Sequence, residues 1–126
     1  MKEGVAVEKH FRLAALFDQY GMLLTEKQQL CLRLHLFDDF SLSEIGENLQ
    51  ISRQAAYDIL HRSEQLMEEY EAKLMLLKKN EMQKATLREV IGSLESLRTT
   101  ANGIVVDGIL KKIFMLIDEE ENRFDL

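Results

Sequence analysis

The chain has 126 residues, of which 46% are hydrophobic and 30% are charged, and its formal net charge at pH 7 is -6. The length suits one domain or one domain with a helical extension, and the composition excludes a wholly disordered protein. Its single cysteine excludes an intrachain disulfide and a cysteine-based metal cluster. No apolar run is long enough to span a bilayer and the N-terminus lacks the pattern of a secretory signal, so we expect a cytoplasmic protein without membrane insertion.

Two helices are predicted in the first third of the chain. Apolar residues at three- and four-residue spacings predict a helix over about 5–20 that stops near Gly21. Thr25 and Gln28 have the pattern of a capping box, which opens a second helix. Cys31 lies among the apolar positions of that second helix, where a thiol is expected to be buried as a small hydrophobic group.

A helix-turn-helix is predicted over residues 41–62. Ser41 and Glu44 form a second capping box at the start of a short helix, and Ser52 is suited to cap the helix that follows. Two helices that cross at a steep angle need a small residue where they touch, and Gly46 supplies it. The chain is therefore expected to turn tightly between these two helices.

The second helix of this motif is predicted to continue far beyond it. No glycine or proline interrupts residues 52–79, so the recognition helix is expected to run on to about residue 79. Its apolar residues alternate three- and four-residue steps, which is the spacing of a short coiled-coil seam. The apolar positions of this candidate dimerisation seam are Leu60, Met67, Tyr70, Leu74 and Leu77, and Ser63 is its polar position.

Two further helices, at about 84–98 and 103–118, are predicted after a polar break at 80–84, and an acidic end follows at 118–121. These two helices form a hairpin whose apolar faces need a partner surface. The seam provides that surface, on the same chain or on a second chain. We therefore predict a homodimer through this half of the protein.

The predicted fold class is all-α, with a helix-turn-helix like that of sigma factor region four, a long following helix and a C-terminal helical hairpin. Residues 1–62 form a helical domain that ends in the helix-turn-helix. Residues 63–126 form the helical extension and the hairpin, which are expected to dimerise.

The exposed start of the helix after the turn holds the candidate DNA contacts. Arg53 suits guanine and Gln54 suits adenine in a two-hydrogen-bond geometry, although both are also ordinary residues for a solvent-facing helix start. Tyr57 is equally compatible with contacting phosphate or a partner and with packing on the shorter helix. The candidate DNA-binding residues are Ser52, Arg53, Gln54, Tyr57, Asp58, His61 and Arg62.

The charge of this segment argues against strong DNA binding. Residues 41–62 contain two basic and three acidic side chains, and neutralisation of phosphate supplies most non-specific affinity. Asp58 can accept a hydrogen bond from the amino group of cytosine, but its charge also repels phosphate. We therefore predict weak DNA binding by a monomer.

Residues 42–53 resemble region four of bacterial sigma factors, with Gly46 where alanine is usual; Ala56, just beyond, stands where valine is usual. A closer resemblance is to the YlxM family, small helix-turn-helix proteins of Gram-positive bacteria, and it covers about residues 10–78. The segments that carry it are Leu-Thr-Glu-Lys-Gln at 24–28, Asp-Asp-Phe-Ser-Leu-Ser-Glu-Ile at 38–45, Ser-Arg-Gln-Ala-Ala-Tyr-Asp at 52–58 and Glu-Glu-Tyr-Glu-Ala-Lys-Leu at 68–74.

This resemblance implies a DNA-binding regulatory protein with an inferred link to the signal recognition particle pathway. An alternative function is that of a protein–protein adaptor, in which the helix-turn-helix is only a scaffold. An acidic surface that includes Glu68, Glu69 and Glu71 would then bind a basic partner, such as a component of the signal recognition particle.

The sequence contains no pattern typical of an enzyme or a metal site. His10, His35 and His61 fall on different predicted helices, and none has the spacing of a metal-binding or catalytic motif. The glycines are scattered and form no phosphate-binding loop. We expect no enzymatic activity, no metal and no cofactor.

Overall fold

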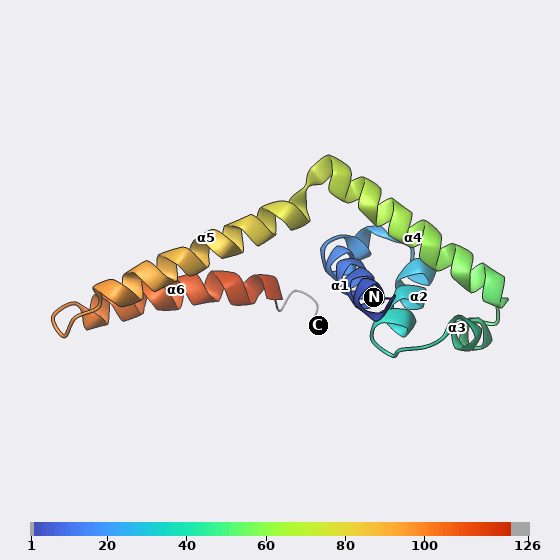
Figure 1. Ribbon diagram of the computed structural model, residues 1–126, viewed down its shortest axis with the longest axis horizontal. Helices are drawn as coiled ribbons and strands as arrows, with labels where there is room; N and C mark the ends of the chain where they lie inside the picture. The colour runs from blue at the N-terminus through green and yellow to red at the C-terminus, as the bar shows by residue number, and fades with distance from the viewer. Residues whose placement is uncertain (1, 122–126) are drawn as a thin grey trace. The chain divides into compact units, whose positions relative to one another are not determined.

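The computed structural model is all-helical, which confirms the predicted fold class (Figure 1). It describes the backbone of residues 2–121 and the side chains of residues 7–117. The acidic end predicted at 118–121 therefore has no described side chains. The elements are α1 (Lys2–Tyr20), the short 3-10 helix η1 (Gly21–Leu23), α2 (Glu26–Leu36), α3 (Leu42–Leu49), α4 (Arg53–Leu74), α5 (Leu76–Leu97) and α6 (Gly103–Glu121).

The chain divides into two units, Met1–Leu77 and Lys78–Leu126. This boundary lies later in the chain than the predicted one between residues 62 and 63. The reason is that α4 contacts α1, α2 and α3 and thus belongs entirely to the first unit. None of the described helices is long and apolar enough to cross a membrane.

The core of the first unit is formed where α4 packs across α1 and α2 (Figure 1). Leu16, Leu32, Ile45 and Met67 are fully buried there, so each helix contributes apolar surface that it could not bury alone. Cys31 is also fully buried, as predicted. Burial raises the pKa of its thiol, and nearby Lys27 lowers it by a smaller amount.

Both predicted capping boxes are present. The backbone N–H of Gln28 donates to the Thr25 hydroxyl at 3.2 Å, and the Gln28 side chain accepts from the Thr25 N–H at 3.0 Å. Ser41 and Glu44 repeat the pattern at 3.2 and 3.3 Å. These reciprocal hydrogen bonds satisfy N–H groups that have no partner within the helix, and they fix where α2 and α3 begin.

The turn between α3 and α4 passes very close to Gly46, as predicted from its small size. A Cβ atom on Gly46 would lie 2.8 Å from the carbonyl oxygen of Ile51 and 3.3 Å from the carbonyl carbon of Ser52. Gln50 reverses the chain here in the left-handed conformation, with φ 58°. The N–H of Ile51 then donates to the Gly46 carbonyl at 2.9 Å. Even the alanine usual at this position in sigma factors would press on backbone atoms.

Replacing Gly46 with alanine is expected to destabilise the first unit by about 1–3 kcal/mol, because the turn must move away from the added methyl group. Gly92 in α5 is the matched control, since a Cβ there meets nothing within 4 Å. Gly92→Ala should leave stability unchanged or raise it by up to about 1 kcal/mol. Urea unfolding followed by circular dichroism measures both, and equal stability of the two variants would contradict the tight approach.

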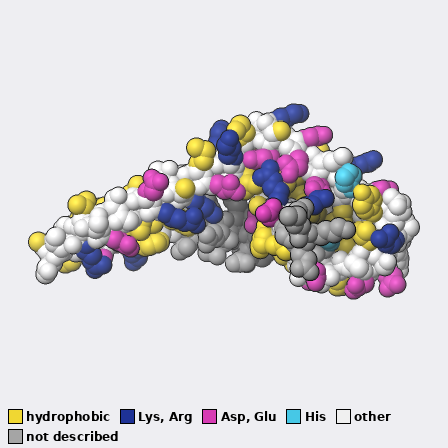
Figure 2. Space-filling view, in the orientation of Figure 1, with side chains coloured by type: hydrophobic (Ala, Val, Ile, Leu, Met, Phe, Trp, Pro, Cys, Tyr) yellow, Lys and Arg dark blue, Asp and Glu magenta, His cyan; other side chains and the backbone are white. Residues whose placement is uncertain are grey.

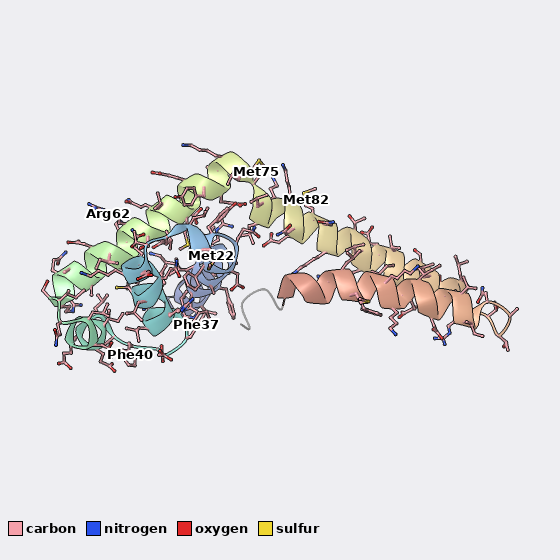
Figure 3. The ribbon with its side chains drawn as sticks, turned by 180° about the vertical axis from the view of Figure 1, so that it is seen from behind. Met22, Phe37, Phe40, Arg62, Met75 and Met82 are labelled. Carbon is pink, nitrogen blue, oxygen red and sulfur yellow. The ribbon has the colours of Figure 1, made fainter. Side chains whose placement is uncertain are left out.

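The predicted continuation of the recognition helix to residue 79 is wrong. α4 ends at Leu74, and Met75 adopts the left-handed conformation with φ 54° and ψ 28° (Figure 3). α5 begins immediately afterwards at Leu76. The predicted break at 80–84 is also wrong, since α5 runs through this segment to Leu97.

Two side chains of the first unit hold this break in place. The Glu71 carboxylate accepts hydrogen bonds from the Tyr20 hydroxyl at 2.5 Å and from the backbone N–H of Leu77 at 3.0 Å. The Tyr20 oxygen accepts from the N–H of Leu76 at 3.3 Å. Free N–H groups at the start of α5 are thus capped by the nearby Glu71 and by Tyr20, which lies far away in the sequence, and these caps replace the glycine or proline that usually marks such a break.

Tyr20→Phe is expected to lower the free energy of unfolding by about 1–3 kcal/mol, because it removes a donor from the buried Glu71 carboxylate. Tyr70→Phe is the matched control. Tyr70 is a half-buried residue of α4 whose ring lies near that of Tyr20, and its hydroxyl makes no hydrogen bond with the described residues. Denaturant unfolding should separate the two variants. Equal losses would show that the hydroxyl itself contributes nothing.

The same variant should also change how stability depends on pH. Burial, followed by the hydrogen bond to Glu71, raises the pKa of Tyr20 above its ordinary 10.0. The folded protein therefore holds this proton more tightly than the unfolded chain does. The resulting stabilisation is present below about pH 10 and is lost as the pH rises through the folded-state pKa. We expect the stability difference between wild type and Tyr20→Phe to shrink at alkaline pH.

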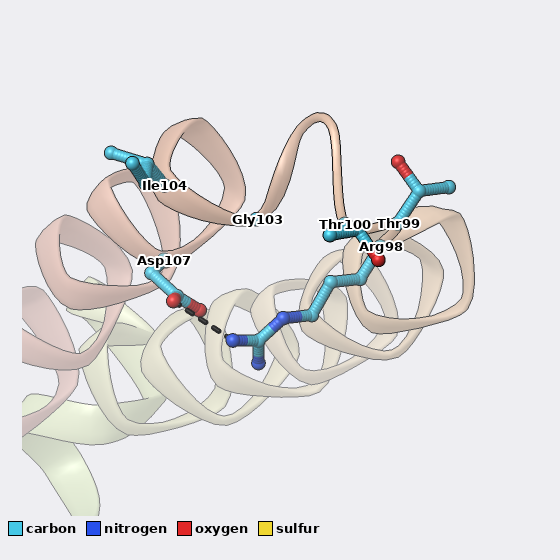
Figure 4. Close-up of a pocket in the computed structure, with 6 residues that line it drawn as sticks. All are labelled: Arg98, Thr99, Thr100, Gly103, Ile104 and Asp107. Atoms are coloured by element: carbon cyan, nitrogen blue, oxygen red, sulfur yellow. Dashed lines mark hydrogen bonds and ion pairs between the residues drawn. The ribbon is translucent and has the colours of Figure 1, made fainter.

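The second unit contains the predicted hairpin of two helices, joined by a turn at residues 98–102. The backbone N–H of Thr99 donates to the Asn102 side chain at 2.6 Å, and the Asn102 amide donates to the Leu97 carbonyl at 2.9 Å. Arg98 and Asp107 form an ion pair at 2.9 Å across the turn (Figure 4). The turn is therefore fixed by its own side chains.

Little of the apolar surface of this hairpin is covered. Among its described side chains, Val106 and Leu110 are the buried hydrophobic ones after Leu77. Large hydrophobic side chains are exposed on both helices, and Figure 2 shows them on the surface of α5 and α6 among lysines and arginines. The most exposed are Met82, Leu97, Ile104 and Val105. The predicted need for a partner surface thus remains within the described part of this unit.

Candidate nucleic-acid-binding surface

The candidate surface is built on the first three turns of α4. The Ser52 hydroxyl accepts the backbone N–H of Ala55 at 2.9 Å and so caps this helix, as predicted. Ala56 on the inner side is fully buried, which fixes the rotation of the helix. Six of the predicted contact residues are exposed along this segment of α4: Arg53, Gln54, Tyr57, Asp58, His61 and Arg62.

The two arginines of this surface are available to bind an anion. Arg53 and Arg62 make no hydrogen bond or ion pair with the side chains that the structure describes, and Arg62 extends from α4 in Figure 3. The Gln54 amide instead donates to the Asp58 carboxylate at 3.0 Å. That hydrogen bond holds the two side chains together one turn apart, so neither is free without breaking it.

Tyr57 and His61 form a stacked pair one turn apart on α4. Their ring centroids lie 5.6 Å apart and the ring planes differ by only 7°. Tyr57 is 46% exposed, so the stack presents an aromatic face at the edge of the surface. Tyr57 also lines a cavity together with Leu42 of the shorter helix, so the alternative in which its ring packs on that helix stays open.

A cavity of about 450 Å³ lies at one edge of the surface, between the start of α2 and α4. It brings Lys27 beside Arg62 and Asp58. Lys27 lies outside the helix-turn-helix segment at 41–62, and its position in the sequence does not predict that it comes close to α4. Its place next to the capping box of α2 is the one signal in the sequence, because lysine near a capped helix start is compatible with contacting phosphate. The lining residues are Thr25, Lys27, Gln28, Ala55, Asp58, Ile59 and Arg62.

A second cavity of about 450 Å³ lies at the opposite edge and collects all three histidines of the chain. The ring centroids of His10 in α1 and His35 in α2 are 6.2 Å apart. The predicted separation of the histidines onto different helices is confirmed, but the fold reunites them in space. We call this site the histidine cavity, and its lining residues are Lys9, His10, Leu13, His35, Leu42, Tyr57, Leu60, His61 and Glu64. No group of three potential metal ligands among the described residues is arranged to hold a metal.

The charge of the candidate surface differs from that of residues 41–62 when side chains from the neighbouring helices are included. In space, the exposed side of α4 and its two flanking cavities combine Arg53, Arg62, Lys9 and Lys27 with two carboxylates, Asp58 and Glu64. This set carries four positive and two negative charges, whereas residues 41–62 alone carry two positive and three negative ones, so the neighbouring helices make the charge balance of the surface less acidic. Glu44, one of the three acidic residues counted there, is moreover held in its capping box.

The predicted dimerisation seam is largely used inside the first unit. Leu60, Met67 and Leu77 are buried in its core, and Tyr70 packs against that core with its ring 5.9 Å from that of Tyr20. Leu74 is the one seam residue with substantial exposure, at 45%. The spacing that suggested a coiled coil equally serves a helix lying across α1 and α2, and the fold uses it in that way.

The acidic surface of the adaptor alternative is also changed by the fold. Glu71 is buried and holds the α4–α5 break. Glu68 forms an ion pair with Arg12, whose guanidinium donates two hydrogen bonds to the carboxylate at 3.0 and 3.1 Å. Glu69 is the only one of the three that is exposed and has no such partner in the described part of the chain. The three carboxylates therefore do not form one open acidic face.

Another cavity, of about 530 Å³, lies at the α5–α6 turn (Figure 4). Its two charged lining residues, Arg98 and Asp107, pair with each other. Thr99, Thr100, Gly103 and Ile104 complete the lining. This composition offers no unpaired charge to a ligand, so the helix-turn-helix surface remains the stronger candidate.

Comparison with known proteins agrees with this geometry. A family model described as "Putative helix-turn-helix protein, YlxM / p13 like" matches residues 7–104, which extends the resemblance beyond residue 78. The family is described by its helix-turn-helix and not by an enzymatic activity.

Individual relatives share between two fifths and one half of their aligned residues with this chain. A UPF0122 protein of Halalkalibacterium halodurans is 44% identical over 106 residues, which cover 74% of this chain and 97% of the relative. The UPF0122 protein YlxM of Bacillus subtilis is 51% identical over 75 residues, covering 60% and 68%. A UPF0122 protein of Limosilactobacillus reuteri is 41% identical over 108 residues, covering 72% and 96%. The chain belongs to the YlxM / p13-like family of helix-turn-helix proteins.

Proposed function

We propose that this protein is a DNA-binding regulatory protein that places the N-terminal half of α4 in the major groove. The observation that carries the proposal is the pair of exposed arginines, Arg53 and Arg62, on a capped helix at the exit of a tight helix-turn-helix. An arginine at the start of such a helix can donate two hydrogen bonds to guanine, and an arginine farther along the same helix can contact phosphate.

The neighbouring cations support the same orientation. Lys27 flanks α4 on the Arg62 side, and Lys9 flanks it on the Tyr57 side. A duplex whose groove receives α4 has its two phosphate backbones on either side of the helix, where these lysines lie. Phosphate contacts of this kind position the protein, and the residues at the centre of the helix read the bases. In a bacterium, this function requires the protein to be in the cytoplasm.

Arg53→Ala is expected to weaken binding to duplex DNA by roughly five- to a hundredfold, corresponding to the loss of one two-hydrogen-bond contact or one strong phosphate contact. Fluorescence anisotropy with a labelled duplex at two salt concentrations measures the effect. The affinity should fall as salt rises, because bound cations are released from the DNA when the protein binds.

Arg88→Ala is the matched control for this experiment. Arg88 is an exposed arginine on α5 that belongs to the second unit, and its loss removes the same charge. Its effect on affinity should be small. Equal affinities for the two variants, or no duplex binding by the wild-type protein at low salt, would contradict the proposed function.

We also propose that the protein is a homodimer through its second unit. Val105, Ile109 and Leu116 recur at steps of four and seven residues along one side of α6, next to the stripe that packs in the hairpin. They are 66%, 40% and 57% exposed. An exposed apolar stripe on a helix is stabilised by burial, and a second copy offers the same stripe in return. A dimer would present two recognition helices to DNA.

Size-exclusion chromatography with light scattering is expected to give twice the chain mass of 14.6 kDa for the wild-type protein. Val105→Glu should shift it to the monomer, because a charge would be buried in the contact. Lys111→Glu, exposed on the same helix but on a different side from Val105, Ile109 and Leu116, is the control for added acidity and should remain dimeric. A monomeric wild-type protein at micromolar concentration would rule this assembly out.

A further inference from the structure

We propose that the histidine cavity binds one unpaired nucleotide of a nucleic-acid strand, with its base among the aromatic rings and its phosphate at Lys9. The cavity combines four rings, an apolar floor, one carboxylate and one ammonium group. This set of groups matches the parts of a nucleotide one by one. The cavity proposal rests on the proposed function only in that both sites bind nucleic acid, and it adds a second site with a different ligand.

The walls of the cavity are two pairs of rings. Tyr57 and His61 are stacked with nearly parallel planes, so their exposed face can extend the stack by one further ring. His10 and His35 lie at 6.2 Å on the other two helices, with their planes inclined by 58°. Stacking on aromatic side chains is how proteins bind unpaired bases, and it tolerates any base because every base has a π-face.

The floor of the cavity is apolar. Leu13 and Leu60 are buried, and Leu42 at the start of α3 is half-buried against the same core. A base that stacks on the rings would therefore lose contact with water along one edge as well as on its stacked face. The volume of about 450 Å³ lies within the range of roughly 300–1,000 Å³ typical of small-molecule sites.

The two charged residues of the cavity are placed for the polar parts of a nucleotide. The half-buried Glu64 carboxylate can accept a hydrogen bond from the amino group of adenine, cytosine or guanine. Lys9 is exposed on α1 and can pair with the phosphate. A plain anion would use Lys9 but would gain nothing from the floor, the rings or Glu64, so the cavity favours a nucleotide over phosphate alone.

An unpaired nucleotide is the form that fits, because the bases of an intact duplex are stacked and cannot enter a cavity beside the helix. Tyr57 and His61 belong both to the candidate DNA-binding residues and to the walls of the cavity. A strand that is single-stranded next to a bound duplex, or a single strand alone, could therefore place a base there. DNA and RNA share this chemistry, and the 2′-hydroxyl distinguishes them.

The chain provides its own reporters for this site. Its three histidines all line the cavity, so every imidazole Cε1–H signal in a proton NMR spectrum of the full chain comes from a residue of the cavity. The probes are deoxyadenosine 5′-monophosphate, adenosine 5′-monophosphate and ribose 5-phosphate. The two nucleotides should shift all three signals with saturation, whereas ribose 5-phosphate at the same concentration should shift them far less.

The relative affinities of the two nucleotides identify the strand that the cavity prefers. Equal shifts with ribose 5-phosphate would show a simple anion site and overturn the proposal. No shift with any probe at millimolar concentration would also overturn it. All titrations are made at one pH, since histidine protonation itself moves these signals.

Two variants separate this site from the proposed duplex-binding surface. His10→Ala removes an exposed ring from the wall and should weaken nucleotide binding roughly fivefold or more, as expected for one stacking contact. Gln65→Ala, exposed on α4 outside the cavity, is the matched control and should have no effect.

Arg53→Ala should leave nucleotide binding unchanged, because Arg53 does not line the cavity. Nucleotide binding that persists while the wild-type protein fails to bind duplex DNA would sink the proposed function and leave the cavity proposal standing. Duplex binding without any nucleotide-induced shift would do the reverse.

Discussion

The packing of α4 across α1 and α2 is the constraint on which both the fold and the candidate surface depend. One side of this helix carries Ala56, Leu60, Ser63 and Met67 into the core of the first unit. The polar member is satisfied locally, because the Ser63 hydroxyl donates to the Ile59 carbonyl at 2.6 Å. With that side covered, the opposite side must face solvent. Arg62 lies on that opposite side and is therefore exposed as a consequence of core packing. Arg53 lies on the same side as Ala56 and Leu60, and it is exposed because it is the first residue of α4.

Local signals in the sequence were sufficient where a structure depends on neighbours in the chain. The capping boxes at Thr25 and Ser41, the cap at Ser52 and the close approach at Gly46 were all predictable, because each is a contact within about six residues. The end of α4 was not predictable in this way. It depends on Tyr20, which lies 56 residues before the N–H group that it caps, and Met75 carries no preference for the left-handed conformation.

The candidate site shows the same division between local and distant contacts. The exposed residues of α4 could be predicted, since a helix-turn-helix determines which side of its second helix is free. Lys9 and Lys27 could not, because they reach the surface through the packing of α1 and α2. Most of the predicted seam residues are buried within the first unit, for a related reason. A three-and-four spacing reports that one side of a helix is covered, and it does not say whether the cover is a second copy or the same chain.

The electrostatics of the protein follow from this redistribution of charge. A chain with a net charge of -6 approaches DNA against a repulsive average field, so affinity must come from the local arrangement of cations within a few Debye lengths of the phosphates. In the first unit, Arg12 neutralises Glu68 in an ion pair, and the Glu71 carboxylate is buried and accepts a hydrogen bond from the Tyr20 hydroxyl. The cations flanking α4 are left without such partners among the described residues. An acidic protein can therefore present cations at its recognition surface, and the excess negative charge elsewhere disfavours binding in any other orientation.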